Sequence, residues 1–256
     1  MKEFFGFGGY IREPEGYFSW QHLTFVTLLM VIMVAAAAFF GRKNRLRDDK
    51  TKNIGLIVSA IAIDALEIFK IIIFCWRSDE SFPILYNLPL FLCSIQLITI
   101  PLAAFSRGRV KEAAMDFVFI FGVLGAVLGT YAAGQNYGCY PVLSIDNVVS
   151  GLTHSIAGFA SLYIAFSGLI SMKKKNIWIT FSILAFFGCA AYIANIYTDS
   201  NYMFLSRGDG TPYDILFNLV GGHEILYPIG VMVLFVLYIL AYYGIYYRVS
   251  KKAESK

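Results

Sequence analysis

The chain has 256 residues, of which 58% are hydrophobic and only 15% are charged, and its formal net charge is +4. A soluble domain has about 25% charged residues. The single core of a soluble protein with a chain of this length could not bury so much apolar surface. The composition therefore excludes a soluble cytosolic enzyme, a disordered chain and a disulfide-rich secreted domain. The basic residues flank apolar runs, so we expect no nucleic-acid partner. We expect an all-α, multi-pass protein of the cell membrane.

Seven apolar segments are long enough to cross a membrane, because a helix needs about 20 residues to span ~30 Å of hydrocarbon. They cover residues 20–40, 54–76, 83–105, 114–134, 148–171, 176–197 and 218–247. Residues 1–19 lack the basic stretch and short apolar run of a cleavable signal, so the first span should be retained. Since little chain remains outside the spans, we expect residues 1–256 to form a single transmembrane helical domain.

Basic residues lie mainly on one side of the predicted bundle. Sixteen of the 21 Lys and Arg residues fall in segments 41–53, 106–113 and 172–175 and in the C-terminal tail. Four lie on the opposite side, and Lys70 lies within the second span. The positive-inside rule therefore predicts that the N-terminus is outside and the C-terminus is in the cytoplasm. An even number of spans would break this alternation.

The second predicted span contains three charged residues, Asp64, Glu67 and Lys70, along one flank of the helix. Charges at this depth cost roughly 2.5–3.5 kcal/mol each and normally face the bundle interior or a wet cavity. Glu67 and Lys70 are spaced to form an ion pair. Lys70 is equally compatible with a structural ion pair and with a polar chamber, whereas the chamber is favoured for Asp64 and Glu67.

All three histidines fall in or near the outer half of their predicted spans. His22 begins the first span beside Trp20 and is typical of an interfacial residue. His154 lies at least one turn inside the fifth span, which makes it a better candidate for a base or ligand. His223 and Glu224 could cap the last span, bind a metal or support another ligand. No spacing typical of a metal site accompanies them, so we expect neither a metal nor another cofactor.

The four cysteines, Cys75, Cys93, Cys139 and Cys189, show no C-x-x-C spacing. Cys75 and Cys139 should both lie near the outer face, where a disulfide could form, although two unpaired apolar cysteines are favoured. Cys93 should lie ~15 Å into the third span, at about the depth of His154. A thiolate with a nearby imidazole base is a nucleophile for acyl transfer or hydrolysis. On the residues alone, a packing role explains Cys93 better.

Several segments, in order along nearly the whole chain, resemble the YwaF-type bacterial integral membrane proteins. The matching segments are Asn87–Ile95 with its Leu-Pro-x-x-x-Cys pattern, Gly151–His154, Asn201–Leu205 followed by Pro212, and, more weakly, Trp20–His22. The chain departs from this family pattern in two places. Phe91 and Leu92 lie where many members have a polar residue near the cysteine, and Pro212 is further from Asn201–Leu205 than usual.

The chain is also similar to a eukaryotic multi-span protein that acylates ether phospholipids through a cysteine, and more remotely to membrane hydrolases of branched fatty-acid esters. This resemblance implies that Cys93 is a nucleophile and His154 its base, with Asn201 and Tyr202 at the outer mouth of the site. The other polar residues expected to line the pocket or orient the base are Asp64, Glu67, Lys70, His22, His223 and Glu224.

Two functions therefore stay open. The first is a lipid acyltransferase or lipid hydrolase with a Cys-His site, for which membrane lipid is both environment and possible substrate. The second is an ion- or proton-coupled carrier, or a ligand-binding membrane protein, that uses Asp64, Glu67 and Lys70. No internal repeat typical of a carrier is visible, so the enzyme is slightly favoured. The sequence does not indicate an oligomeric state.

Overall fold

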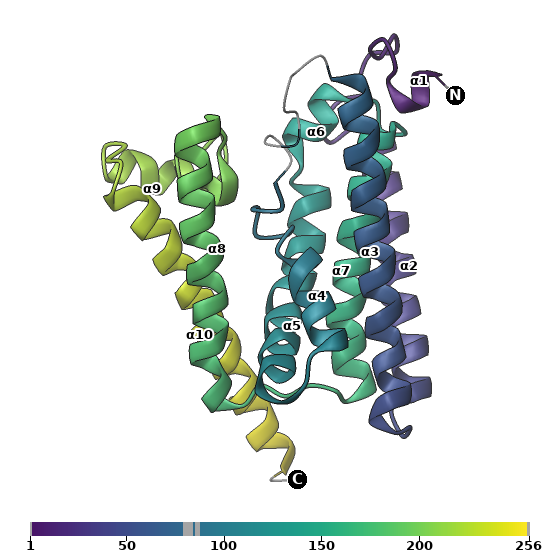
Figure 1. Ribbon diagram of the computed structural model, residues 1–256, viewed down its shortest axis with the longest axis vertical. Coiled ribbons are helices and arrows are strands. Elements are labelled where there is room, and N and C mark those ends of the chain that lie inside the picture. The colour runs from purple at the N-terminus through teal and green to yellow at the C-terminus, as the bar shows by residue number, and fades with distance from the viewer. Residues whose placement is uncertain (1, 79–83, 85–87, 255–256) are drawn as a thin grey trace. The chain divides into compact units, whose positions relative to one another are not determined.

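The computed structural model describes residues 2–78, 84 and 88–254 of the chain, and for residues 252–254 it describes the backbone alone. The structure is 76% helical, with no strand in the described ranges, so the predicted all-α class is confirmed (Figure 1). The internal contacts divide the chain into two units. Unit 1 comprises Met1–Asn87 and Gln96–Ser171, and unit 2 comprises Leu88–Ile95 and Met172–Lys256. The single-domain organisation stays a prediction.

Unit 1 is built around one central helix. Its helices are α1 (Lys2–Phe5), α2 (Trp20–Asn44), α3 (Asp49–Arg77), α4 (Gln96–Phe105), α5 (Gly108–Tyr131), α6 (Gly134–Cys139) and α7 (Ile145–Ser167). Helix α7 packs against α2, α3 and α5. Small residues allow this close approach, because a Cβ added to Gly122 of α5 would lie 2.6 Å from the carbonyl oxygen of Ala157 in α7.

Contacts at the two ends of unit 1 show which helix ends lie together. At one end, the Tyr163 hydroxyl of α7 donates to the carbonyl of Lys52 at 2.8 Å and accepts from Asn44 at 3.0 Å. At the other end, Arg77 of α3 contacts Asp146 of α7. Segments 41–53 and 106–113 thus share the Tyr163 end, where Lys111 donates to Asn53 at 2.5 Å. The basic residues predict that these two segments lie on the same side.

Unit 2 is smaller and contains more irregular backbone. It consists of the segment Leu88–Ile95 together with η2 (Lys174–Asn176), α8 (Ile177–Thr198), η3 (Tyr202–Phe204), α9 (Tyr213–Leu219) and α10 (Leu226–Glu254). Helix α10 packs against α8 and α9, and α8 also contacts η3. A Cβ added to Gly188 of α8 would lie 2.5 Å from the Met232 side chain of α10, so the two helices approach closely here.

Five helices in the described part of the chain are long and apolar enough to cross a membrane: α2, α5, α7, α8 and α10. The protein is therefore a multi-pass membrane protein. Helix α3 has 29 residues, but three charges lie in its apolar stretch. In the predicted third span, 83–105, the described residues 88–95 are not helical and the α-helix begins at Gln96; this helix has ten residues and contains Pro101. The count of seven spans and the orientation stay predictions.

Candidate functional site

Cys93 lies on irregular backbone and not within the helix that the sequence predicts. The segment Leu88–Ile95 is a series of turns, in which the Leu90 N–H donates to the Leu88 carbonyl at 2.8 Å. Pro89 contributes to the start of this irregular stretch, since proline has no N–H to donate and disfavours helical geometry in the residue before it. Cys93 is partly buried and precedes α4 by three residues. We call Leu88–Ile95 the Cys93 turn.

The Cys93 turn packs against a loop from the far end of the sequence. The Leu88 N–H donates to the Tyr202 hydroxyl at 3.1 Å, across 114 positions of sequence. The Phe91 ring lies edge-on to the Tyr202 ring, with centroids 5.1 Å apart, and 6.2 Å from the Phe204 ring. The cysteine segment and the Asn201–Leu205 segment, both picked out by the resemblance, therefore form one structure within unit 2.

Asn195 of α8 holds Tyr202 by its backbone. The Tyr202 N–H donates to Asn195 Oδ1 at 2.7 Å, and Asn195 Nδ2 donates to the Tyr202 carbonyl at 3.1 Å. Both residues are buried. The next two residues, Met203 and Phe204, adopt φ values of 56°, which are unfavourable for side chains of this kind. Such strain persists only where the surrounding contacts impose it, and it is concentrated at functional sites.

Asn201 closes the loop that follows. Its Oδ1 accepts from the N–H groups of Ser206 at 3.0 Å and Arg207 at 3.3 Å, while its Nδ2 donates to the Arg207 carbonyl and to Asp209 at 2.8 Å each. Asn201 is thus fully engaged in shaping the loop. We call Asn195, Asn201 and Tyr202, with the loop they hold, the Tyr202 platform.

His154 is partly buried in α7 of unit 1. Its Nδ1 lies 2.7 Å from the Ser150 carbonyl, which can only accept, so in the neutral ring Nδ1 carries the proton and Nε2 has the lone pair. The ring lies directly over Gly129 of α5, where an added Cβ would be 2.0 Å from Nε2. The packing therefore presents the basic nitrogen of His154 toward α5.

His22 has a structural role and is fully buried, not interfacial as the sequence suggested. Its Nδ1 accepts from the Phe18 N–H at 3.2 Å, and its Nε2 lies 3.1 Å from the Thr130 carbonyl. The Tyr137 ring packs against it at a tilt, with centroids 3.9 Å apart. Trp20, two positions before His22, is 73% exposed and has the exposure of an interface residue. Because both ring nitrogens of His22 are engaged, it joins α2 to α5.

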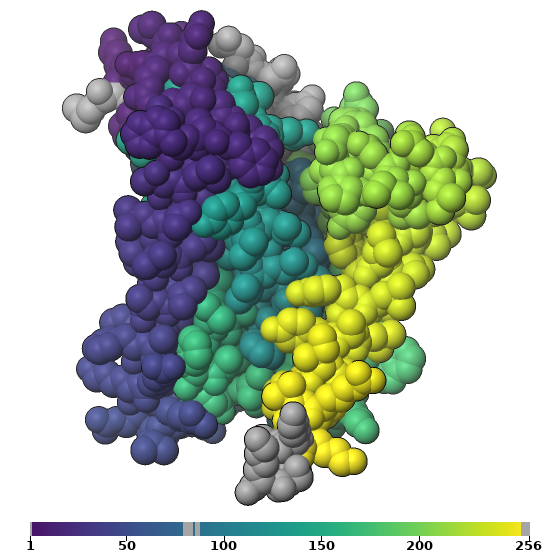
Figure 2. All heavy atoms as spheres, turned by 180° about the vertical axis from the view of Figure 1, so that it is seen from behind, coloured from purple at the N-terminus to yellow at the C-terminus, as the bar shows by residue number. Residues whose placement is uncertain are grey.

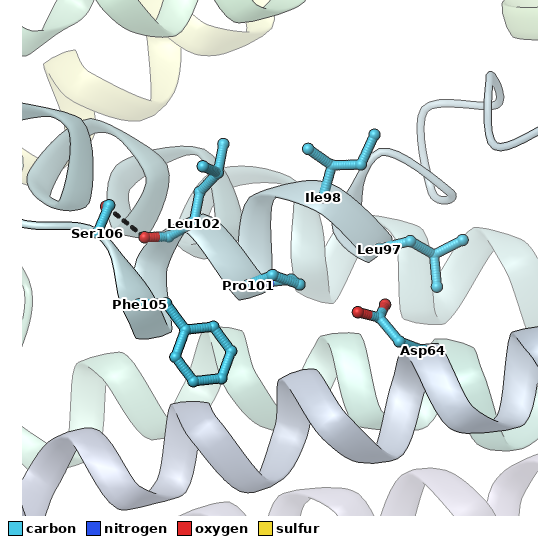
Figure 3. Close-up of a pocket in the computed structure, with 7 residues that line it drawn as sticks. All are labelled: Asp64, Leu97, Ile98, Pro101, Leu102, Phe105 and Ser106. Atoms are coloured by element: carbon cyan, nitrogen blue, oxygen red, sulfur yellow. Dashed lines mark hydrogen bonds between the residues drawn. The ribbon is translucent and has the colours of Figure 1, made fainter.

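The charges of α3 separate into a pair and a single carboxylate. Lys70 Nζ lies 2.6 Å from Glu67 Oε1, which confirms the predicted ion pair. Asp64 instead lines an open recess of about 500 Å³ between α3 and α4 (Figure 3). The other lining residues are Leu97, Ile98, Pro101, Leu102, Phe105 and Ser106. Neither Glu67 nor Lys70 lines this recess.

His223 caps the last long helix, as one of the sequence alternatives predicts. Its Nδ1 accepts from the N–H groups of Ile225 at 3.2 Å and Leu226 at 3.4 Å, at the start of α10. Glu224 beside it is exposed. Cys75 and Cys139 are both free thiols, so the possible disulfide between them is not formed.

One polar cluster escapes the sequence analysis. Arg77 forms a bidentate ion pair with Asp146, in which both N···O distances are 2.7 Å. The Tyr10 hydroxyl donates to Asp146 at 2.5 Å, and Arg77 also donates to the Phe5 carbonyl at 3.1 Å. Burial, together with the hydrogen bond to Asp146, raises the pKa of Tyr10 above its usual range. The available signal was that Arg77 and Asp146 stand at neighbouring span ends on the side with few basic residues.

This cluster fastens the N-terminal segment to unit 1. Residues 2–18, which we call the N-terminal strap, lie over the end of unit 1 that contains Asp146, and their purple atoms gather there in Figure 2. Glu15 accepts from the Val142 N–H at 2.8 Å and adds a second attachment. The strap therefore covers that end of the helices of unit 1.

The sequence was compared with known proteins. A model of the TMEM164 family matches residues 17–247. No curated protein and no solved structure matches the chain.

Proposed function

We propose that this chain, which belongs to the TMEM164 family of membrane proteins, transfers or hydrolyses lipid acyl groups with Cys93 as the nucleophile. The observation that carries the proposal is the attachment of the Cys93 turn to the Tyr202 platform, through the Leu88 N–H and the Phe91 ring. A cysteine with only a packing role needs no such support.

Irregular backbone is costly in a membrane protein. Non-helical N–H and C=O groups are tolerated at membrane depth only when they are buried in protein or line a wet cavity. The Cys93 turn replaces the first part of a predicted span, and Tyr202 satisfies one of its N–H groups. A fixed, partly buried thiol on such backbone is what a nucleophile needs, since catalysis requires the reacting group to be held in position.

The proposed chemistry proceeds in two steps. The Cys93 thiolate attacks the carbonyl carbon of a lipid ester, the C–O bond breaks, and the released alcohol takes a proton from the protonated base. The resulting thioester then reacts with a second lipid hydroxyl or with water, whose proton returns to the base while the thiolate leaves. The first acceptor gives an acyltransferase and the second a hydrolase. Apolar surroundings in the membrane favour lipid substrates.

His154 is our candidate for the base, as the resemblance implies. The Ser150 carbonyl fixes its tautomer, which leaves Nε2 as the basic nitrogen. That is the arrangement that general bases of the Cys-His type use, in which a third group orients the ring. The proposal requires Nε2 to come within hydrogen-bond reach of the thiol during the reaction.

Trapping of the acyl group tests the proposal. The full chain in lipid nanodiscs is incubated with a phospholipid that carries an alkyne-tagged acyl chain, and the label on the protein is measured before and after hydroxylamine, which cleaves thioesters. We expect label on the native chain and none on Cys93→Ala. Cys189→Ala is the matched control, because Cys189 is an exposed cysteine of α8 in the same unit. Equal labelling of Cys93→Ala and the native chain contradicts the proposal.

A second variant separates the base from the nucleophile. In Gly129→Ala, the new methyl group would overlap the His154 ring and displace it without changing its chemistry. We expect labelling to slow at neutral pH in this variant and in His154→Gln, and to recover at alkaline pH, where the thiol ionises without a base. Unchanged labelling in both variants removes His154 from the mechanism and leaves Cys93 to be judged on its own.

Other finer assignments stay predictions: the likeness to YwaF-type proteins, location in the cell membrane and lipid as substrate. The carrier that would use Asp64, Glu67 and Lys70 is likewise untested. Since Lys70 already neutralises Glu67, a carrier would have to depend on Asp64.

A further inference from the structure

The recess between α3 and α4 combines a carboxylate with an apolar lining. Asp64 is its only charged lining residue among the described ones, and Figure 3 shows the carboxylate directed from α3 toward Leu97 and Pro101 of α4. No hydrogen-bonding or charged side chain of the described residues acts on Asp64. The nearest ion pair on α3, between Glu67 and Lys70, is complete without it. Within the apolar stretch of α3, Asp64 is therefore the charge that the Glu67–Lys70 pair does not balance.

One backbone acceptor of α4 at the recess lacks its usual helical partner. Pro101 has no N–H, so the Leu97 carbonyl lacks the helical hydrogen bond that residue 101 would otherwise donate. The one hydroxyl, on Ser106, already donates to the Leu102 carbonyl. An occupant that complements this lining must donate hydrogen bonds or carry positive charge. An anion or a neutral acyl chain would leave the carboxylate and the carbonyl uncompensated.

The apolar walls define the rest of the occupant. Leu97, Ile98, Leu102 and Phe105 surround the polar end, and a volume of about 500 Å³ falls in the range of ligand sites. The Phe105 ring can also contribute to binding of a cation through its face. A bare metal ion does not fit, because one carboxylate and one carbonyl among apolar side chains supply too few oxygen ligands.

We propose that this recess binds a lipophilic monocation, an ammonium-type group attached to an apolar body, whose charge pairs with Asp64. The site belongs to unit 1 and is independent of the Cys93 chemistry, so either proposal can fail without the other. The cation has two possible sources, an ammonium-bearing membrane lipid or a free amphiphile, and both present the same chemistry to Asp64.

Binding of radiolabelled tetraphenylphosphonium to the purified full chain in uncharged maltoside micelles tests this proposal. We expect saturable binding that is weakened about tenfold or more in Asp64→Asn, since the charge partner is lost. The matched control is the double variant Glu67→Gln/Lys70→Gln, which removes the neighbouring pair without changing the net charge and should bind as the native chain does. A neutral analogue, tetraphenylsilane, should not compete.

Further measurements identify the source of the bound cation and control for misfolding of the variants. Competition by added phosphocholine lipid assigns the site to lipid, and competition by a soluble alkylammonium alone assigns it to a free amphiphile. Leu102→Trp fills the recess and should abolish binding while leaving Asp64 in place. Equal affinity of the native chain, Asp64→Asn and Leu102→Trp would overturn the proposal, as would competition by tetraphenylsilane or a native chain that binds no more probe than empty micelles.

Discussion

The N-terminal strap of unit 1 and the Cys93 turn of unit 2 are both irregular segments, and they are held by opposite kinds of chemistry. Charged groups hold the strap, because Tyr10 and Phe5 attach to the bidentate pair of Arg77 and Asp146. Neutral groups hold the Cys93 turn, through the hydroxyl and ring of Tyr202 and the Asn195 amide beneath them.

The difference predicts how each region fails. Removing one partner of a largely buried ion pair leaves an uncompensated charge, which costs more than the pair itself contributes. Removing one neutral hydrogen bond costs about 1–3 kcal/mol when the remaining partner is buried. Loss of one charged partner should therefore destabilise the strap by a large amount. Loss of one hydrogen bond should destabilise the Tyr202 platform by a smaller amount. A loosely held nucleophile reacts less selectively. The loss of each platform contact should therefore be measurable as a change in the reactivity of Cys93.

The largest effect is expected from Asp146→Asn. The Arg77 guanidinium, whose side chain is 13% exposed, would face a neutral amide, and we expect the free energy of unfolding to fall by about 3 kcal/mol. Thermal unfolding in detergent, followed by intrinsic fluorescence, measures the loss. The double variant Arg77→Gln/Asp146→Asn should recover part of it, because no lone charge remains. If Asp146→Asn unfolds at the native temperature, the strap is not held by charge.

The next largest effect is expected from Asn195→Leu. Both the N–H and the carbonyl of Tyr202 would lose buried partners, at a cost of about 2 kcal/mol. In a chain that keeps Cys93 as its only cysteine, we expect maleimide to react with Cys93 faster than in the same chain with Asn195. Tyr197→Phe, an exposed change on the same helix, is the control and should leave the rate unchanged. An unaltered rate in Asn195→Leu would separate the platform from the Cys93 turn.

Helix-level features could be predicted from the sequence because apolar length and charge distribution act locally. The predicted spans 20–40 and 176–197 agree closely with α2 (Trp20–Asn44) and α8 (Ile177–Thr198). The third predicted span is not one continuous helix, because the stretch from Leu88 to Ile95, which contains Pro89, is irregular, and hydropathy does not register this. The Glu67–Lys70 pair was predictable since three positions on one helix fix the distance between side chains.

The tertiary contacts of the site were harder to predict from the sequence. The resemblance indicated Tyr202 by its position in a loop element, but only the fold shows that its hydroxyl supports Leu88. His22 looked interfacial beside Trp20, yet the strap and Tyr137 bury it. Arg77 and Asp146 are 69 positions apart, and their places at predicted span ends on one side do not by themselves indicate that the two side chains meet. Contacts made by loops and straps depend on packing that no local pattern encodes.

A smaller effect is expected from Tyr202→Phe. The ring contact with Phe91 would remain, and the hydrogen bond from the Leu88 N–H would be lost, at about 1 kcal/mol. Maleimide should react with Cys93 faster than in the native background but more slowly than in Asn195→Leu. Should Tyr202→Phe exceed Asn195→Leu, the hydroxyl would be the main support of the turn and the order of contributions within the platform would be reversed.

The smallest effect is a pH dependence that only the strap should show. In the unfolded chain Tyr10 ionises near its ordinary pKa of about 10, whereas in the folded chain burial and the hydrogen bond to Asp146 raise that pKa. The contribution of the Tyr10 phenol is thus complete below pH 10 and is lost as the pH rises through the folded pKa. Tyr10→Phe should therefore reduce stability at pH 8 by about 0.5 kcal/mol, a value lowered by solvent access to this half-buried side chain.

Above pH 10 the difference between Tyr10→Phe and the native chain should shrink. Comparing the two chains cancels the ionisation of the other 16 tyrosines, which both share. The difference between Asn195→Leu and the native chain should stay constant over the same range, since an amide does not titrate. Chemical unfolding at pH 8, 10 and 11 measures both differences. If the two differences change in parallel with pH, the strap is held by the same neutral chemistry as the Cys93 turn, and charge does not distinguish the two regions.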